Sequence, residues 1–362
     1  MKLKATFSIL CVISLAFGMS QSPAPASVSS YIVQGHTLEA ATNAVSSVDG
    51  AITHELGVIR AVAADLTDRQ VAKLRSRDGI RRIYDNGAVE TAARRIKEED
   101  STGNRSADSS GSSAVYETHY PSLVRADAVH DMGITGTGIG IAVLDTGLRK
   151  TDGIKYDDTG TTRIKAVYNA ITDSVANNPL SGSDPAGHGS HVTSIAVSSI
   201  LTDIGKYNGI APGAHLVSAQ AFDANGNGTY ADVIRAIDWV VSNKKKHKRK
   251  VLNLSFSAEP RSHYWDDPIN QAVMVAWQNE IFVVAAAGNR GPDPMTIGVP
   301  GNVPYVMTVG AMTDNYTPAD GSDDILASFS SAGPTVEGFV KPEVVAPGGH
   351  VLGLMHGESQ LA

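Results

Sequence analysis

The sequence predicts an α/β fold, a parallel sheet in three layers, preceded by a small α+β domain. From Tyr116 onward, near-continuous Val/Ile/Ala strands alternate with helical stretches, in a 362-residue chain that is 42% hydrophobic. Strands of this kind are buried on both faces by the helices that connect them. Ahead of them, residues 27–92 hold shorter strand and helix patterns of their own. A separate small domain is therefore expected before the large one.

The first segment, residues 1–26, has the pattern of a secretory signal peptide. Lys2 and Lys4 precede an apolar stretch from Phe7 to Phe17, followed by small and polar residues. The stretch is shorter than the roughly 18 apolar residues of a membrane span, and no later stretch reaches that length. We expect a secreted protein, extracellular or periplasmic, without membrane contact after signal removal. The single cysteine, Cys11, lies in this segment, so the mature chain has no disulfide.

The small domain is expected to alternate short strands with two helices. Its expected elements are a strand at Tyr31–Val33, a helix near Leu38–Leu56, a strand at Gly57–Val62, a helix at Thr67–Arg75 and a strand at Ile80–Tyr84. Residues 93–115 are charged and then Ser/Gly-rich, with few large apolar side chains. Such a segment cannot bury a core and is expected to be a solvated linker.

The large domain, residues 116–362, is expected to place its chemistry where its strands end. The expected strands are Ile139–Leu144, Ile164–Tyr168, His215–Ala221, Val251–Phe256, Ile281–Ala286 and Tyr305–Ala311, with helices beginning near Val124, His188, Tyr230 and Pro268. In open parallel sheets, active sites lie at the carboxyl ends of strands. Asp145 and Asn289 each come just after an expected strand.

Two segments carry the residues of a proton-transfer pair. Ile141-Ala-Val-Leu-Asp-Thr-Gly147 is an apolar strand that ends in Asp145, and Gly187-His-Gly-Ser-His191 places His188 between glycines at a helix start. A buried Asp beside a His fixes the imidazole tautomer and stabilises the imidazolium. The neutral ring can then take a proton from a serine hydroxyl and return it to a leaving amine.

A third segment, Val283-Val-Ala-Ala-Ala-Gly-Asn289, completes a recognisable order. The succession of Asp, His and an amide donor resembles the subtilisin-like serine proteases, or subtilases. The resemblance implies a subtilisin-like fold and a serine endopeptidase in which Asp145 orients, His188 is acid and base, and Asn289 stabilises the oxyanion. It also implies a zymogen, in which residues 27–92 are a propeptide that acts as folding template and inhibitor.

The same resemblance implies a substrate cleft in which an extended peptide lies between two strands. The implied substrate-binding residues are Gly226, Asn227 and Gly228 on one side, Ser255, Phe256 and Ser257 on the other, and Ala286, Ala287 and Gly288 in the far wall of the primary pocket. Small residues in that wall leave room for a medium or large apolar side chain before the scissile bond. Ser257 stands where the family usually has glycine.

Two other protease classes use residues of the same types. Aspartic proteases need two Asp-Thr-Gly motifs on separate lobes. The second copy here, Asp158-Thr-Gly160, follows polar residues too soon after the first and is interpreted as a turn. His188 and His191 lack the glutamate and spacing of a zinc protease helix. We therefore assign no metal and no cofactor. The family resemblance alone allows a structural calcium ion, which no carboxylate cluster places.

The nucleophile is not evident. Ser359 is the only serine after Gly348; it lacks a Gly-Thr-Ser turn and has no helix after it. We therefore expect the chain as written to be inactive. Two hypotheses remain open, an endopeptidase by family or a catalytically dead remnant that acts through its propeptide-like domain.

Charge limits the possible partners. The net charge of −7 argues against a nucleic-acid partner, and the basic run Lys244–Lys250 is interpreted as a solvated turn. The expected partners are a protein or peptide substrate and the chain's own propeptide.

Overall fold

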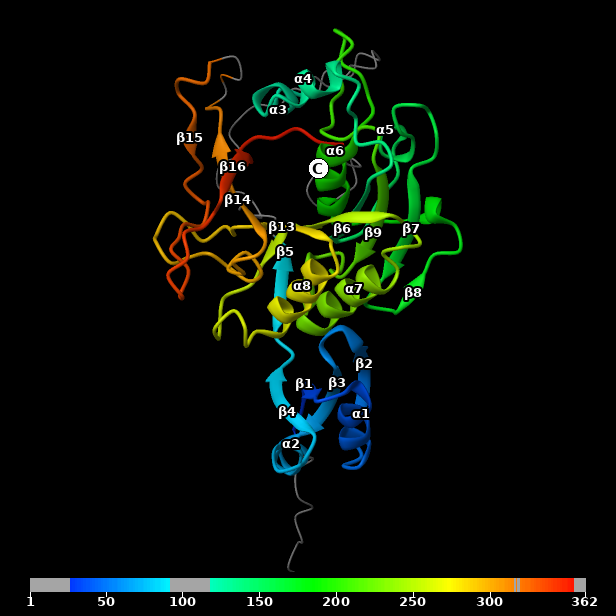
Figure 1. Cartoon of the computed structure of the whole chain (residues 1–362), viewed down its shortest axis with the longest axis vertical. Helices are drawn as coiled ribbons and strands as arrows, with labels where there is room; N and C mark the ends of the chain where they lie inside the picture. Colours follow the sequence, from blue (N-terminus) through cyan, green and yellow to red (C-terminus); the bar gives the residue numbers. More distant parts are fainter. Residues whose placement is uncertain (1–26, 92–117, 316, 318–319, 355–362) are drawn as a thin grey trace, which may run out of the picture.

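The large sheet is built from parallel strands that begin and end close to their predicted positions. The computed structural model describes residues 27–91, 118–315, 317 and 320–354 (Figure 1). The parallel strands are β6 (Gly140–Asp145), β7 (Ile164–Asn169), β9 (His215–Gln220), β11 (Arg249–Leu254), β13 (Phe282–Ala286), β14 (Met307–Thr313) and β16 (Val344–Pro347). Their order is β14-β13-β11-β6-β9-β7, with β16 beside β14 and the short antiparallel strands β8 (Ser174–Val175) and β15 (Ile325–Leu326) at the edges. The predicted three-layer α/β fold is confirmed.

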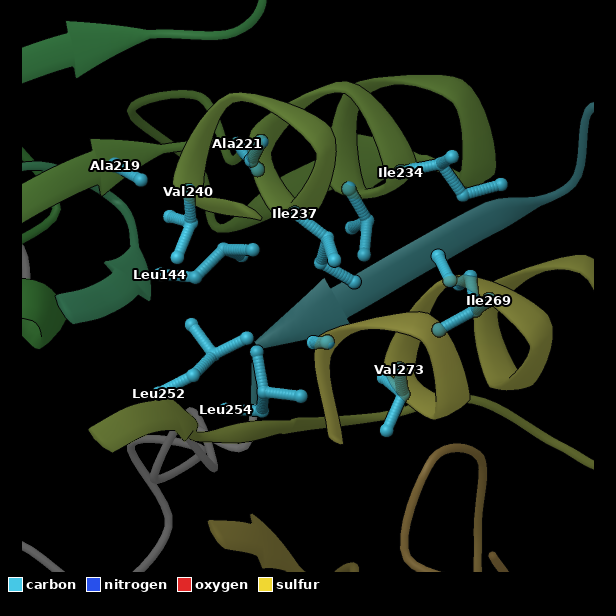
Figure 2. Packing of buried hydrophobic residues seen from close by; sticks show 14 of the residues in the cluster. Leu144, Ala219, Ala221, Ile234, Ile237, Val240, Leu252, Leu254, Ile269 and Val273 are labelled. Atoms are coloured by element: carbon cyan, nitrogen blue, oxygen red, sulfur yellow. The ribbon is translucent and has the colours of Figure 1, made fainter. Parts of the chain in front are cut away.

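Helices cover both faces of this sheet because successive side chains of a strand point to opposite sides. Ala142 and Leu144 of β6 pack with helices α7 (Tyr230–Ser242) and α8 (Pro268–Gln278) in one core. Figure 2 shows Leu144 and Leu252 facing Ile237 and Val273 of these helices. Val143 belongs to the opposite core, with Val197 of α6 (His188–Val197).

The remaining described helices of the large domain are short. They are α3 (Tyr120–Leu123), α4 (Ala126–Asp131), α5 (Asp152–Lys155) and the 3-10 helix η3 (Pro179–Ser181). The helix predicted to begin near Val124 is divided into α3 and α4 because Arg125 has φ +59°. In the part of the chain that the structure covers, no helix has the length and apolar character needed to cross a bilayer.

The small domain is a four-stranded antiparallel sheet, in the order β2-β3-β1-β4, with two helices on one face. Its elements are β1 (Val28–Gly35), α1 (Leu38–Ser46), β2 (Ala51–Leu56), the 3-10 helix η1 (Gly57–Ile59), β3 (Ala61–Thr67), α2 (Asp68–Arg75) and β4 (Ile80–Asp85). Two predictions were wrong here. The helix expected over Leu38–Leu56 ends at Ser46, because Asp49 turns left-handed (φ +56°) and the chain continues as β2. The strand expected over Gly57–Val62 begins only at Ala61, after η1.

Both faces of this small sheet are buried. Val33 and Ala64 pack under α1 and α2, whereas their neighbours Ile32 and Ala63 belong to the core of the large domain. An isolated sheet with helices on one face would leave Ile32 and Ala63 in water. The small domain is therefore docked through its open sheet face onto α7 and α8, as Figure 1 shows.

After β4 the chain enters the large domain as one more strand. β5 (Ala88–Thr91) lies antiparallel between β10 (Asn227–Thr229) and β12 (Phe256–Ser257). Val89 of β5 is 1% exposed and belongs to the large core, together with Phe222 and Phe256. The expected signal peptide, the linker and Ser359 lie outside the described residues.

Candidate active site

Asp145 is placed at the carboxyl end of β6, between β9 and β11. It is 1% exposed, and its Oδ1 accepts a hydrogen bond from Thr146 N at 2.7 Å. The chain then turns away at Gly147, which has φ +130°; a Cβ there would lie 2.4 Å from the carbonyl oxygen of Ser183. Glycine is therefore required at position 147, where the chain turns after Asp145.

His188 is the first residue of α6, and its Nδ1 lies 2.6 Å from Asp145 Oδ1. Because a carboxylate only accepts, Nδ1 carries the proton and Nε2 keeps its lone pair. Within the described chain, Nε2 makes no hydrogen bond, so this nitrogen can accept a proton. The close approach of α6 to the end of β6 depends on Gly189, because a Cβ there would lie 2.3 Å from the carbonyl oxygen of Gly147.

The electrostatics favour the imidazolium form of His188. Burial lowers its pKa, but the charge of Asp145 and the hydrogen bond to it outweigh burial, and Asp184 adds to the effect, so the pKa of His188 is raised. A raised folded-state pKa means that this ion pair contributes stability at pH values below the pKa of the unfolded chain. That contribution is lost as the pH rises through the raised value.

We expect Asp145→Asn to lower the pKa of His188, because it removes the anion that holds the proton on the ring. Titration of the histidine side chains by NMR measures this directly. His215 on β9 is the internal control, because its pKa is lowered by its own burial and by Lys165, and it should not move. An unchanged His188 titration in the variant would contradict the pairing.

Asn289 follows β13 and borders a cavity of about 660 Å³. Ser257 of β12 and Thr91 of β5 line the same cavity. A second cavity, of about 1300 Å³, is bordered by Asn289 and by His191 of α6. Asn289 therefore lies where the cleft that holds β5 meets the space beside α6.

The predicted cleft strands hold β5 by main-chain pairing. Thr91 N donates to Gly226 O at 3.0 Å, Asn227 pairs with Glu90 and Gly228 with Val89. On the other side, Phe256 pairs with Thr91 and Ser257 with Glu90. These strands therefore accept an extended segment on both edges.

The other predicted wall residues border the second cavity. Ser255, Ala286, Ala287 and Gly288 line the larger one. Gly288 also faces Ser257, since a Cβ on Gly288 would lie 2.7 Å from Ser257 Oγ. That hydroxyl is buried without a hydrogen-bond partner among the described residues. Serine at position 257, where the family usually has glycine, therefore fills space beside Gly288 without gaining a hydrogen bond.

Sequence reasoning missed a buried network behind the Asp–His pair. Asp184 is 3% exposed and accepts hydrogen bonds from the Thr146 and Ser190 side chains, each at 2.7 Å. One signal for it was present in the sequence. Asp184 lies four residues before His188, and Gly187, at the N-cap of that helix, has no side chain to cap it. His191 is directed away from this network, with Nε2 3.0 Å from Val351 O.

The second Asp-Thr-Gly, Asp158–Gly160, forms a turn in which Asp157 Oδ1 accepts from the amides of Thr159 and Thr161. Among the described ranges, no group of three or more His, Cys, Asp or Glu side chains could hold a metal ion.

A parallel sheet with an Asp–His pair at its carboxyl edge and a strand-binding cleft beside it defines a protease-like class. The model of the subtilase family (Peptidase_S8) matches residues 136–362. The chain belongs to the subtilase family.

Individual relatives agree with this assignment. The chain is 36% identical over 226 residues to serine protease AprX of Bacillus subtilis (strain 168), covering 61% of this chain and 48% of AprX. It is 30% identical over 229 residues to subtilisin E of the same organism, covering 63% of this chain and 51% of that protein. It thus spans about half the length of the curated relatives that it matches.

A solved structure matches the fold of this chain over most of its length. Fervidolysin of Fervidobacterium pennivorans, a keratinolytic enzyme related to subtilisin, matches with a TM-score of 0.65 at 23% identity. The match covers 93% of this chain and 49% of that one.

Proposed function

We propose that this chain supplies the Asp–His pair, the oxyanion donor and the substrate cleft of a secreted subtilase serine endopeptidase. The observation that carries the proposal is the 2.6 Å hydrogen bond between His188 Nδ1 and the buried Asp145. The cleft beside it already holds an extended strand, β5, between β10 and β12. A peptide substrate would bind in the same extended form.

The proposed chemistry is acyl transfer to a serine. His188 Nε2 takes the proton of the serine hydroxyl as its oxygen attacks the scissile carbonyl, and Asp145 stabilises the imidazolium. Asn289 donates its side-chain N–H to the developing oxyanion. The imidazolium then returns the proton to the leaving amine. The nucleophile itself is proposed from a segment outside the described residues, and Ser359 does not have the expected context.

We further propose that residues 27–92 are a propeptide that inhibits this site. Support comes from the tail of the small domain, which reaches the cleft across the start of α7. Gly87 O accepts from Tyr230 N and Asn86 Oδ1 from Ala231 N, both at 2.9 Å. The tail therefore caps α7, whose first N–H groups have no partner within the helix.

The body of the small domain supports the same assignment through polar contacts with α7 and its neighbours. His54 Nε2 lies 3.1 Å from Asp232 Oδ1, and Arg235 Nη2 donates to Thr53 O at 2.6 Å. Arg82 forms an ion pair with Asp266 at 2.5 Å. Hydrogen bond partners for groups of the large domain thus come from residues that a mature enzyme would lose.

The remaining parts of the proposal follow the domain order. Residues 1–26 are proposed as a secretory signal, 93–115 as the linker and 116–362 as the peptidase domain, with protein or peptide substrates. A structural calcium ion is proposed from the family alone. The alternative, a catalytically dead remnant that acts through its inhibitor domain, is favoured by the same seating of β5, because occupation of the cleft requires no catalysis.

Activity assays test whether Ser359 can act as the nucleophile, which neither proposal expects. We expect residues 27–362 to hydrolyse neither casein nor a fluorogenic peptide above background, and a serine-directed phosphonate to leave Ser359 unlabelled. Turnover together with labelling at Ser359 would contradict this expectation.

A chimera tests the proposed machinery itself. The nucleophile segment of a curated subtilisin, joined after residue 354, should restore casein hydrolysis. His188→Ala in the chimera should then lower kcat about 10²- to 10⁴-fold, because the general base is lost. A chimera that folds and binds peptide but never turns over would favour the remnant.

A further inference from the structure

Asp184 is a buried carboxylate that no step of the proposed mechanism uses. It is 3% exposed, and both of its oxygens are fully engaged. Oδ1 accepts from Thr146 Oγ1 at 2.7 Å and from Gly187 N at 3.0 Å. Oδ2 accepts from the amide and the hydroxyl of Ser190, each at 2.7 Å. Four donor groups on three residues thus converge on one side chain.

Asp184 and Thr146 together accept the hydrogen bonds of the backbone N–H groups at the start of α6. The N-cap of this helix is Gly187, in a left-handed conformation, and glycine has no side chain to accept from the first turn. Thr146 Oγ1 accepts from Gly189 N at 2.9 Å and Asp184 Oδ2 accepts from Ser190 N. These are the second and third N–H groups of the helix, the ones that an N-cap side chain normally satisfies. The cap of the helix that begins with His188 is therefore supplied by other residues.

The hydrogen bonds of Asp184 also extend to Asp145 through Thr146. Thr146 donates its amide to Asp145 Oδ1 at 2.7 Å, while its hydroxyl donates to Asp184. One residue thus connects the carboxylate at the end of β6 with the carboxylate that holds α6. Both partners of the Asp145–His188 bond are tied to Asp184 within one or two hydrogen bonds.

We propose that Asp184 is a positioning residue, which holds Thr146 and the first turn of α6 together and thereby sets the Asp145–His188 geometry. The proposal rests on the function proposed above. A carboxylate suits the task because it accepts at both oxygens, whereas an amide of the same shape presents an NH₂ group to two of the four donors. Asp184→Asn therefore breaks the network without changing its volume.

The experiment follows the His188 Nδ1 proton by NMR in the full chain, with histidine labelled by ¹⁵N. In the unaltered protein we expect a low-field resonance that Asp145→Asn abolishes. In Asp184→Asn we expect this resonance to be lost or its exchange with solvent to accelerate at least tenfold. Thr146→Ser should keep it and Thr146→Val should lose it, which retains a test if Asp184→Asn does not fold.

Asp267→Asn is the matched control for a merely structural effect. Asp267 is 2% exposed and caps α8 by accepting from the amides of Ile269 and Asn270 at 2.9 and 3.0 Å. We expect it to lower the melting temperature comparably while the His188 resonance stays in place. If Asp145→Asn abolishes the resonance but Asp184→Asn and Thr146→Val leave it unchanged, the positioning role is overturned and the proposed function stands. No low-field resonance in the unaltered protein would count against both.

Discussion

Val89→Asp is expected to release β5 from the substrate cleft. Val89 is 1% exposed and belongs to the core that contains Phe222, Tyr230 and Phe256, so the new carboxylate would be buried among apolar side chains. Burying a charge among apolar side chains costs more free energy than the backbone pairing of a four-residue strand can offset. Amide hydrogen exchange in the full chain measures the result. Protection of the Thr91 amide, which donates to Gly226 O at 3.0 Å, should fall about 100-fold, which corresponds to about 2.8 kcal/mol.

Ala88→Asp is the matched control on the same strand. Ala88 is exposed, so the added carboxylate stays in water and protection of the Thr91 amide should remain within a few-fold of the unaltered chain. If both variants lose protection equally, the strand is held by its backbone or its charge. Burial of Val89 would then not be what seats the proposed inhibitor tail.

The positions of Asp145 and His188 could be predicted because their signals are local. An unbroken apolar run placed β6 within one residue of its observed bounds, and the following Asp had to emerge at the sheet edge. Glycines on both sides of His188 marked a tight helix start, and α6 begins at that residue. Such features depend on neighbours in the sequence, which a pattern contains.

The features that were missed depend on contacts between distant segments. The sequence of β2 shows only weak alternation, and its strand conformation comes from pairing with β3. Asp184 was not among the predicted site residues, since its partner Thr146 is 38 positions away in sequence. The unpartnered hydroxyl of Ser257 depends on how closely Gly288 and Gly298 pack against it.

The two faces of β13 should differ in how much an introduced carboxylate destabilises the protein. Val283 is 1% exposed and packs in the core that contains α8, whereas Val284, the next residue, is half-buried and lines the cavity of about 1300 Å³ beside α6. Val283→Asp leaves a carboxylate in a dry core and should lower the free energy of unfolding by about 3–5 kcal/mol. Val284→Asp places the same group where water can reach it, and should cost about 1 kcal/mol or less.

A solvatochromic dye and thermal melting measure this difference on residues 27–362. Exposed apolar surface in the cavity should give strong dye binding in the unaltered chain, with a broad melt, because loosely covered apolar faces bind such dyes. Val284→Asp should reduce dye binding without unfolding the protein, since it makes the wall of the cavity polar. Val283→Asp should abolish the cooperative part of the melt. Equal destabilisation by the two variants, or a sharp melt without dye binding in the unaltered chain, would mean that the face of β13 toward α6 is as well packed as the face toward α8.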